Sequence, residues 1–349
     1  MSGGVDSSMA AKLMKDKGYE CIGCTMKLYQ NEDAGVPRSK TCCSLDDVEA
    51  ARSIAFSLDM PFYVLNFTED FRTCVMDRFV QSYEAGRTPN PCIDCNRFMK
   101  FDKLYERAVA YECDCIVTGH YARIECEGGK YVMKKALDET KDQSYVLYSL
   151  TQEQLAHVQF PLGNMRKEEV RKVADASGFV NAHKADSQDI CFVPDGDYAA
   201  FIERHTGKVY PEGDFVDSEG HVLGTHKGIV HYTIGQRKGL GIPFGKPMYV
   251  KGVDVEENKV ILGENDELFS TTLKARDFNW ISGEIPEGEV RCKAKIRYRH
   301  AEQAATVKVL DDQTVEVVFD EPQRAITPGQ AVVLYDGDVV LGGGTIVSK

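Results

Sequence analysis

Alternation of helix-like and strand-like segments in the first third of the chain limits its fold more than any other feature. From Ser7 to about Gly119, helical patterns such as SSMAAKLMKDKG and SLDDVEAARSIAFSLD alternate with short apolar runs such as YECIGCTMKLY, FYVLNF and DCIVTG. Units of this kind place parallel strands in one sheet with helices on both faces. The sequence therefore predicts an α/β domain at the N-terminal end.

After about residue 205 the pattern changes to short strand-like runs separated by Gly, Pro, Asp and Asn. Examples are HYTIG, MYVKGVDV, KVILG, VRCKAKIRYRH, TVEVVF and AVVLYDG. Such spacing is typical of small β domains or barrels. We place domain boundaries near residues 205 and 275.

Charge and composition narrow the class of protein. The 54 acidic residues outnumber the 42 basic ones, for a formal charge of -12, so any contact with nucleic acid depends on local basic patches. No apolar run approaches the ~20 residues of a membrane helix, and MSGGVDSS does not have the features of a secretory signal. We expect a cytoplasmic protein with no membrane partner.

The segment Ser2, Gly3, Gly4, Val5, Asp6, Ser7 and Ser8 runs directly into the first predicted helix. Glycines let a ligand approach the backbone, and N–H groups at a helix start attract anions; a plain glycine-rich turn is the alternative. The loop has no Gly-Lys-Ser/Thr, so it is not a Walker loop. It resembles the SGGxDS loop of the PP-loop ATP pyrophosphatases, which form adenylates.

In that superfamily the loop follows a hydrophobic strand, whereas this sequence has only Met1 before it. Either the start is truncated or the sheet lacks a central strand.

Twelve cysteines are present, and eleven of them lie between Cys21 and Cys191. In an intracellular α/β enzyme we expect reduced thiols. Cys92 and Cys95 form a C-x-x-C before a predicted helix, where thiolate is favoured. The cysteines with apolar neighbours, including Cys126, are interpreted as core residues, and a structural or redox role stays open for the pair at 42 and 43.

Six motifs occur in order along the chain: SGGVDSS, GRTPNPCIDCNRFMKF, TGHYAR, KDQSYVLY, DSQDICFV and YTIGQRKGLGI. Together they resemble the bacterial tRNA-specific 2-thiouridylase family over essentially the whole length. The resemblance implies a PP-loop catalytic domain (1–204) with a parallel sheet, a small central β-rich domain (205–274) and a C-terminal β-barrel that binds tRNA (275–349). It also implies conversion of wobble uridine 34 to 2-thiouridine, with ATP and Mg²⁺.

Residue roles follow from the same resemblance. The loop residues 2–8, with Met26 and Gly119, would bind ATP and adenylate O2 of the uracil. Cys191 would carry sulfur as a persulfide, and Cys95 would act as nucleophile or resolve a disulfide. The tRNA would be contacted by Asn90, Pro91, Cys92, His120, Lys141, Asp142, Gln143, Arg297, Tyr298 and Gln330. The family further implies tRNAs for Lys, Glu and Gln, and sulfur from a cysteine desulfurase or a sulfur-relay protein.

Position 92 departs from the family, because some members carry Asp where this chain has Cys92. Three thiolates, Cys92, Cys95 and Cys191, could hold a [4Fe-4S] cluster with one iron open to hydrosulfide. A structural zinc site usually needs a fourth ligand. The sequence leaves persulfide and cluster chemistry both open.

A row of cations at every second position marks VRCKAKIRYRH: Arg291, Lys293, Lys295, Arg297 and Arg299. On one strand they would share a face over roughly 26 Å and could follow several phosphates, or simply be solvated. Two rival functions remain. A PP-loop ligase that amidates a small molecule would not need Cys95 and Cys191, and a non-catalytic RNA-binding protein with a cysteine metal site would leave SGGVDSS unexplained.

Overall fold

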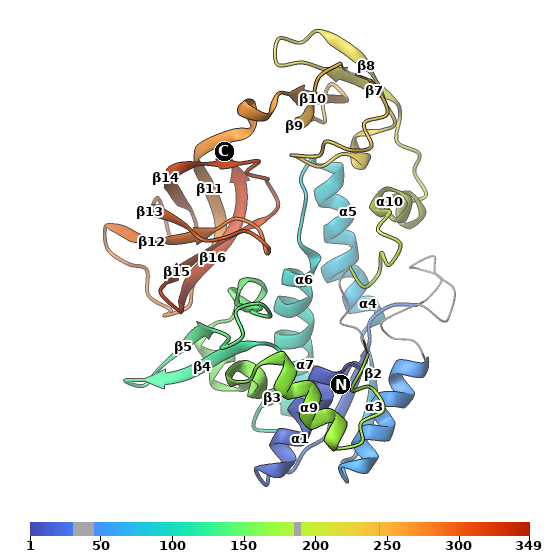
Figure 1. Cartoon of the computed structure of the whole chain (residues 1–349), viewed down its shortest axis with the longest axis vertical. Helices are drawn as coiled ribbons and strands as arrows, with labels where there is room; N and C mark the ends of the chain where they lie inside the picture. Colours follow the sequence, from blue (N-terminus) through green and yellow to red (C-terminus); the bar gives the residue numbers. More distant parts are fainter. Residues whose placement is uncertain (31–44, 185–189, 244) are drawn as a thin grey trace.

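The computed structural model describes residues 1–30, 45–184, 190–243 and 245–349 (Figure 1). Three regions can be followed in Figure 1: an α/β region at the bottom that holds the N-terminus, a small β region at the top, and a barrel at one side in which the chain ends. Helix α5 (Asp77–Glu84) reaches from the α/β region toward the small β region.

The described parallel strands of the α/β region form two short sheets. Strand β1 (Gly23–Lys27) pairs with β2 (Phe62–Asn66), and β3 (Ile116–Val117) pairs with β6 (Val158–Gln159). Met1 lies beside β1, since its amino group donates to the Cys24 carbonyl and the Thr25 hydroxyl donates to the Met1 carbonyl at 2.6 Å. The α/β region therefore has the parallel strands that the sequence predicts, divided between two short sheets in the described residues.

Helices of the α/β region lie close to where the sequence predicts them. The first begins at Val5, inside the glycine-rich segment of residues 2–8, and ends before Gly18, whose φ of +87° only glycine adopts readily. The others described are α3 (Leu45–Ser57), α4 (Thr68–Phe71), α6 (Pro91–Asp94), α7 (Leu104–Ala110), α8 (Gln152–Ala156), α9 (Lys167–Ala176) and α10 (Tyr198–Thr206), after α1 (Val5–Asp16). Two π-helical segments, η1 (Arg72–Met76) and η2 (Cys95–Lys103), join α4 to α5 and α6 to α7. Short 3₁₀ turns are η3 (Ser144–Leu147), η4 (Pro161–Asn164), η5 (Ile229–His231) and η6 (Asn265–Leu268).

The C-terminal barrel has the strand order β11, β14, β13, β12, β15, β16 and is closed by pairing of β11 with β16. Its strands are β11 (Phe269–Trp280), β12 (Glu289–Lys295), β13 (Gln303–Val309), β14 (Val315–Arg324), β15 (Ala331–Asp336) and β16 (Val339–Ser348). The predicted hairpin of the α/β region, β4 (Ala122–Glu127) and β5 (Lys130–Lys135), extends this sheet through Val339 opposite Lys134. Cys126 on β4 is exposed, so its assignment to the core was wrong.

Strand β15 explains how the barrel docks on the α/β region. Val332 and Leu334 point into the barrel core, while Ala331, Val333 and Tyr335 belong to a second core with Tyr145 and Tyr148 of the α/β region. Successive side chains of a strand face opposite ways. Because this strand is buried on both faces, every position is apolar, which gives the continuous run AVVLY. The apolar run is therefore a domain interface.

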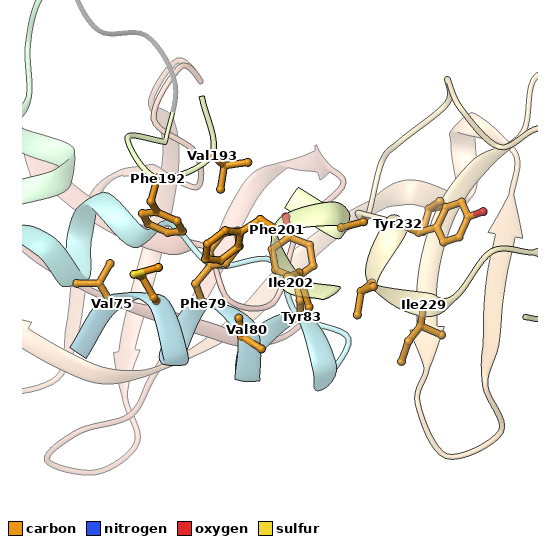
Figure 2. Close-up of a cluster of buried hydrophobic side chains, with 14 of the residues drawn as sticks. Val75, Phe79, Val80, Tyr83, Phe192, Val193, Phe201, Ile202, Ile229 and Tyr232 are labelled. Carbon is orange, nitrogen blue, oxygen red and sulfur yellow. The ribbon is translucent and has the colours of Figure 1, made fainter. Parts of the chain in front are cut away.

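The small β region holds a four-stranded sheet in the order β8, β7, β10, β9. Its strands are β7 (Gly213–Val216), β8 (Val222–His226), β9 (Tyr249–Asp254) and β10 (Lys259–Gly263). Its core is shared with helices of the α/β region: Figure 2 shows Phe79 and Tyr83 of α5 beside Phe201 of α10, with Ile229 and Tyr232 continuing the cluster.

The predicted domain limits fall inside elements of the structure. Helix α10 spans the limit at 205, and strand β11 spans the one at 275. No described helix has the length and apolar character needed to cross a membrane.

Candidate active site

The glycine-rich loop forms the first turn of α1. The hydroxyls of Ser7 and Ser8 each donate to the Gly4 carbonyl at 3.1 Å, and the Ser2 amide donates to Ser7 Oγ at 3.1 Å. Gly3 has φ of +70°, and a Cβ there would lie 2.6 Å from the Asp47 carbonyl oxygen. The loop is held in one conformation by its own serines and by close packing on α3.

Gly119 is needed where a second segment crosses the loop. A Cβ on this residue would lie 2.6 Å from the carbonyl carbon of Asp6 and 2.7 Å from the Ser7 nitrogen. Contacts this short force the backbone apart. Only glycine therefore brings TGHYAR against the start of α1.

A cavity of about 2200 Å³ opens at the loop. It exceeds the roughly 300–1,000 Å³ of most small-molecule sites and so has room for more than a nucleotide. The sequence-predicted residues that line it are Ser2, Gly4, Val5, Asp6, Ser7, Met26, Gly119, His120, Lys141, Asp142, Gln143 and Tyr298, with Lys295 and Arg299 of the predicted cation row. The structure thus brings candidate nucleotide residues and candidate tRNA residues to one space.

Four residues at the loop were missed by the sequence analysis. The Asp6 carboxylate accepts from Tyr121 Oη at 2.9 Å and from Lys167 Nζ, which lies 2.7 Å from both oxygens. The Asn181 amide donates to the Gly3 carbonyl and to Ser8 Oγ, each at 3.0 Å. Lys184 pairs with Asp47. Tyr121 could have been found within TGHYAR, whereas nothing in the spacing of the other three marks them.

Residues 141–143 are fixed to the TGHYAR segment. The Tyr121 amide donates to Gln143 Oε1 and the Gln143 amide donates to the Tyr121 carbonyl, both at 2.9 Å. The Asp142 carboxylate accepts from Ser144 Oγ at 2.7 Å, and the Asp142 carbonyl accepts from Tyr298 Oη at 3.2 Å. Tyr121 therefore links Asp6 on the loop to the candidate tRNA segment.

His120 is a neutral, buried group. Burial, with the nearby Lys100 charge, lowers the pKa of His120 well below its usual value. Lys100 Nζ lies 3.4 Å from His120 Nε2 and Thr118 Oγ1 lies 2.7 Å from Nδ1. Since an ammonium can only donate, Nε2 accepts and Nδ1 carries the proton toward Thr118.

The cysteine segment begins with a capped helix. Asn90 Oδ1 accepts from the Cys92 amide at 3.2 Å, and Pro91 follows at the first helical position. Cys92 is exposed, whereas Cys95 is half-buried against the core cluster that contains Phe192.

Cys191 packs against the same cluster. Its carbonyl accepts from Tyr29 Oη at 2.6 Å, and its neighbour Phe192 lies 5.4 Å from the Phe79 ring centroid and 5.0 Å from that of Phe201 (Figure 2). Met26 lines the cavity and also packs on this cluster, so it contacts both the cavity and the core on which the two thiols pack. The pair at 42 and 43 and residues 186–189 of DSQDICFV lie outside the described residues.

The three candidate cluster ligands are not gathered. Within the part of the chain that the structure describes, no group of three or more His, Cys, Asp or Glu side chains could hold a metal ion. Cys92, Cys95 and Cys191 are all described, so these residues do not fit a three-thiolate cluster, and the [4Fe-4S] alternative has no support.

Arg297 and Gln330 contact protein rather than the cavity. The Arg297 guanidinium donates to the Ala325 carbonyl at 2.8 Å and to Thr327 Oγ1 at 2.7 Å, and lies 3.3 Å from the Ile234 carbonyl of the small β region. The Gln330 amide donates to the Thr88 carbonyl at 2.8 Å. Both residues therefore join domains.

The predicted row of five cations is shorter than expected. Strand β12 ends at Lys295, so Arg297 and Arg299 are not on it, and the prediction of a single strand face was wrong. Arg291 is paired with Asp320, and Lys293 is exposed. Beyond the strand, Ile296 still packs into the barrel core, and the Arg297 guanidinium contacts carbonyls of both the barrel and the small β region.

Family models match the chain in three consecutive parts. The model described as the tRNA methyl transferase HUP domain matches residues 1–195. The tRNA methyl transferase PRC-barrel domain matches residues 199–264, and the aminomethyltransferase beta-barrel domain matches residues 270–346.

Full-length relatives are similar along the whole chain. The tRNA-specific 2-thiouridylase MnmA of Clostridioides difficile is 51% identical, over 99% of this chain and 96% of that protein. The proteins of the same name from Lachnoclostridium phytofermentans and Acetivibrio thermocellus are 50% and 52% identical, each over 99% of this chain and over 98% and 97% of their own lengths. On this similarity and on its three matched domains, the chain belongs to the tRNA-specific 2-thiouridylase family.

Proposed function

We propose that this protein is an ATP-dependent sulfurtransferase that converts uridine 34 of tRNAs for Lys, Glu and Gln to 2-thiouridine, and that it acts in the cytoplasm. The observation that carries the proposal is the shared cavity, because the loop residues Asp6 and Ser7 and the candidate tRNA residues Lys141 and Tyr298 line the same space. A uridine in a single-stranded loop can be turned out of its stack and enclosed there.

The first step makes the oxygen of the base a leaving group. O2 of the uracil attacks the α-phosphate of ATP bound at residues 2–8, Met26 and Gly119, and pyrophosphate leaves. Backbone N–H groups at the start of α1 suit the phosphates. Asp6 and Asp47 are carboxylates at the loop of the kind Mg²⁺ prefers, and the ion when bound supplies positive charge against the phosphates.

The second step replaces that oxygen with sulfur. The terminal sulfur of a Cys191 persulfide attacks C2 and AMP leaves with the oxygen; the Cys95 thiolate then attacks the sulfur of Cys191, releasing 2-thiouridine and leaving a Cys95–Cys191 disulfide for an external thiol to reduce. Packing of both thiols on one core cluster supports this pairing. A cysteine desulfurase or a sulfur-relay protein supplies the persulfide.

The remaining residues proposed to contact tRNA are distributed over a chain that we divide into three domains, 1–204, 205–274 and 275–349. Asn90, Pro91 and Cys92 face the target base, and His120 and residues 141–143 line its pocket. Tyr298 and Gln330 act where the barrel meets the catalytic domain, and Arg297 acts where the barrel meets the small β region.

The test supplies unmodified tRNA, ATP, Mg²⁺, a cysteine desulfurase and cysteine, and detects 2-thiouridine by mass spectrometry of digested tRNA. We expect product from the wild type, none from Cys191→Ser or Cys95→Ser, and retained tRNA binding in both. Cys126→Ser, at an exposed thiol on β4, is the matched control and should equal the wild type. Product from Cys191→Ser at the wild-type rate would contradict the persulfide route, and an amidated small molecule with no thiolated tRNA would identify a different ligase.

A further inference from the structure

We propose that Lys167 and Lys184 are the phosphate-binding cations of the nucleotide site, and that each is held by an aspartate, Asp6 or Asp47, until the triphosphate takes it over. The inference rests on the proposed use of ATP. It adds two lysines to a site that the family resemblance assigns to residues 2–8, Met26 and Gly119.

Both lysines lie against the loop. Lys167 begins α9, its side chain is only 8% exposed, and its ammonium contacts both oxygens of Asp6 at 2.7 Å. Lys184 pairs with Asp47 at the start of α3, and its ammonium is 3.5 Å from the carbonyl of Gly3. All four charged groups line the cavity at the loop.

Stability alone does not account for the Lys167–Asp6 pair. Burying two charges costs desolvation energy that their attraction often fails to recover, so an apolar pair of similar size would serve the fold as well. At an anion-binding site the pair has a function, because it keeps the Lys167 ammonium close to the loop while the Asp6 carboxylate balances its buried charge.

Binding of ATP would also require Asp6 and Asp47 to exchange their lysine partners for another positive charge. A polyanionic triphosphate beside Asp6 and Asp47 would be repelled unless positive charge separates them. Asp6 and Asp47 would hold a divalent cation that binds with the nucleotide, and both ammonium groups would then be available to the phosphates, where a lysine acts as a compact point charge. In the nucleotide complex the aspartates would thus contact the divalent cation, and the lysines would contact the phosphates.

Backbone contacts place the two lysines independently of their aspartates. The Lys167 amide donates to the Asp138 carboxylate at 2.9 Å, which fixes the start of α9. Asn181 donates to Gly3 and Ser8 and so anchors the segment before Lys184 to the loop. Removing either ammonium should therefore leave the loop in place.

The experiment measures binding of ATP and of adenosine to the full chain by calorimetry, with Mg²⁺ and with EDTA. We expect Lys167→Met and Lys184→Met each to weaken ATP binding by about 10- to 100-fold, the value of a lost charge-assisted hydrogen bond, with adenosine affinity unchanged. Lys12→Met is the matched control, since Lys12 forms a lysine–aspartate pair with Asp16 on the same α1 but away from the cavity.

A double variant separates phosphate binding from simple neutralisation of Asp6. In EDTA, Asp6→Asn/Lys167→Met should still bind ATP more weakly than Asp6→Asn alone; equal affinity of the two would mean that Lys167 only balances Asp6 and would overturn the proposal for it. Equal losses of ATP and adenosine binding in the lysine variants would also overturn it, as a structural effect. If the wild type itself binds no ATP, the proposed function fails; if it binds and the lysine variants bind equally well, only this inference fails.

Discussion

The nucleotide loop and the cysteine segment are held in place in different ways. The loop packs on neighbours from the α/β region, with Gly3 packed on Asp47 and Gly119 packed on Asp6. The segment before Cys95 is held by the barrel, since the Thr88 amide donates to the Pro328 carbonyl at 2.9 Å and its carbonyl accepts from Gln330 at 2.8 Å.

This difference indicates a division of labour between the domains. The loop contacts named above lie within the first 184 residues, whereas the segment before Cys95 contacts a domain that begins some 180 residues after Thr88. Substitutions that disturb the docking should therefore slow sulfur transfer without changing ATP affinity. Substitutions that disturb the loop should weaken ATP binding.

The largest effect is expected from Gly119→Ala. Its new methyl group would lie 2.6 Å from the backbone of Asp6 and must push the loop away. We expect ATP binding, measured by calorimetry, to weaken by about 10- to 100-fold, corresponding to the usual 1–3 kcal/mol of an overpacked site.

Gly252→Ala on β9 is the control for this change, because a Cβ there meets its nearest atom at an ordinary 3.7 Å. Unchanged ATP affinity in Gly119→Ala would show that the loop tolerates displacement and would remove the contrast between the two regions.

A smaller and different effect is expected from Gly329→Ala at the barrel junction. Gly329 has φ of +92°, and a Cβ would lie 3.0 Å from three backbone atoms of Thr88. Gly337→Ala is matched to it, since Gly337 also has positive φ, +55°, but has no atom within 4 Å of a Cβ.

Because both variants share the strain of positive φ, their difference reports the docking contact. We expect Gly329→Ala to lose about 1–2 kcal/mol more stability in urea than Gly337→Ala, and to form 2-thiouridine more slowly at unchanged ATP affinity. A parallel loss of ATP affinity would show that the barrel supports the loop as well.

Short-range patterns predicted much of this molecule. The loop at the start of α1, the β4–β5 hairpin and the change to β structure near residue 205 all depend on neighbours in sequence, where turn chemistry and periodicity act. The family motifs added Met26, Gly119 and Tyr298, which line the same cavity although they lie far apart in the chain.

Long-range contacts explain what could not be predicted. The alternation of cations at every second position does not show where β12 ends. Arg297 contacts residues at a domain junction that forms only when the barrel has folded. Lys167 starts an ordinary amphipathic helix and Lys184 lies outside any helix or strand. Their ion pairs with Asp6 and Asp47 cross 161 and 137 residues. The charge around the loop is therefore a property of the tertiary structure.

The smallest effect is expected at His120, which lines the cavity next to Gly119. Its lowered pKa means that the unfolded chain takes up a proton below about pH 6.5 that the folded protein does not. The contribution of His120 to stability is thus complete above the unfolded pKa and is lost as the pH falls below it, by at most about 1.4 kcal/mol per pH unit. Urea unfolding between pH 7.5 and 5.5 should show a shallower loss of stability in His120→Gln than in the wild type. The exposed His221→Gln is the control, and equal pH dependence in the two variants would mean that His120 is free to take up a proton in the folded protein.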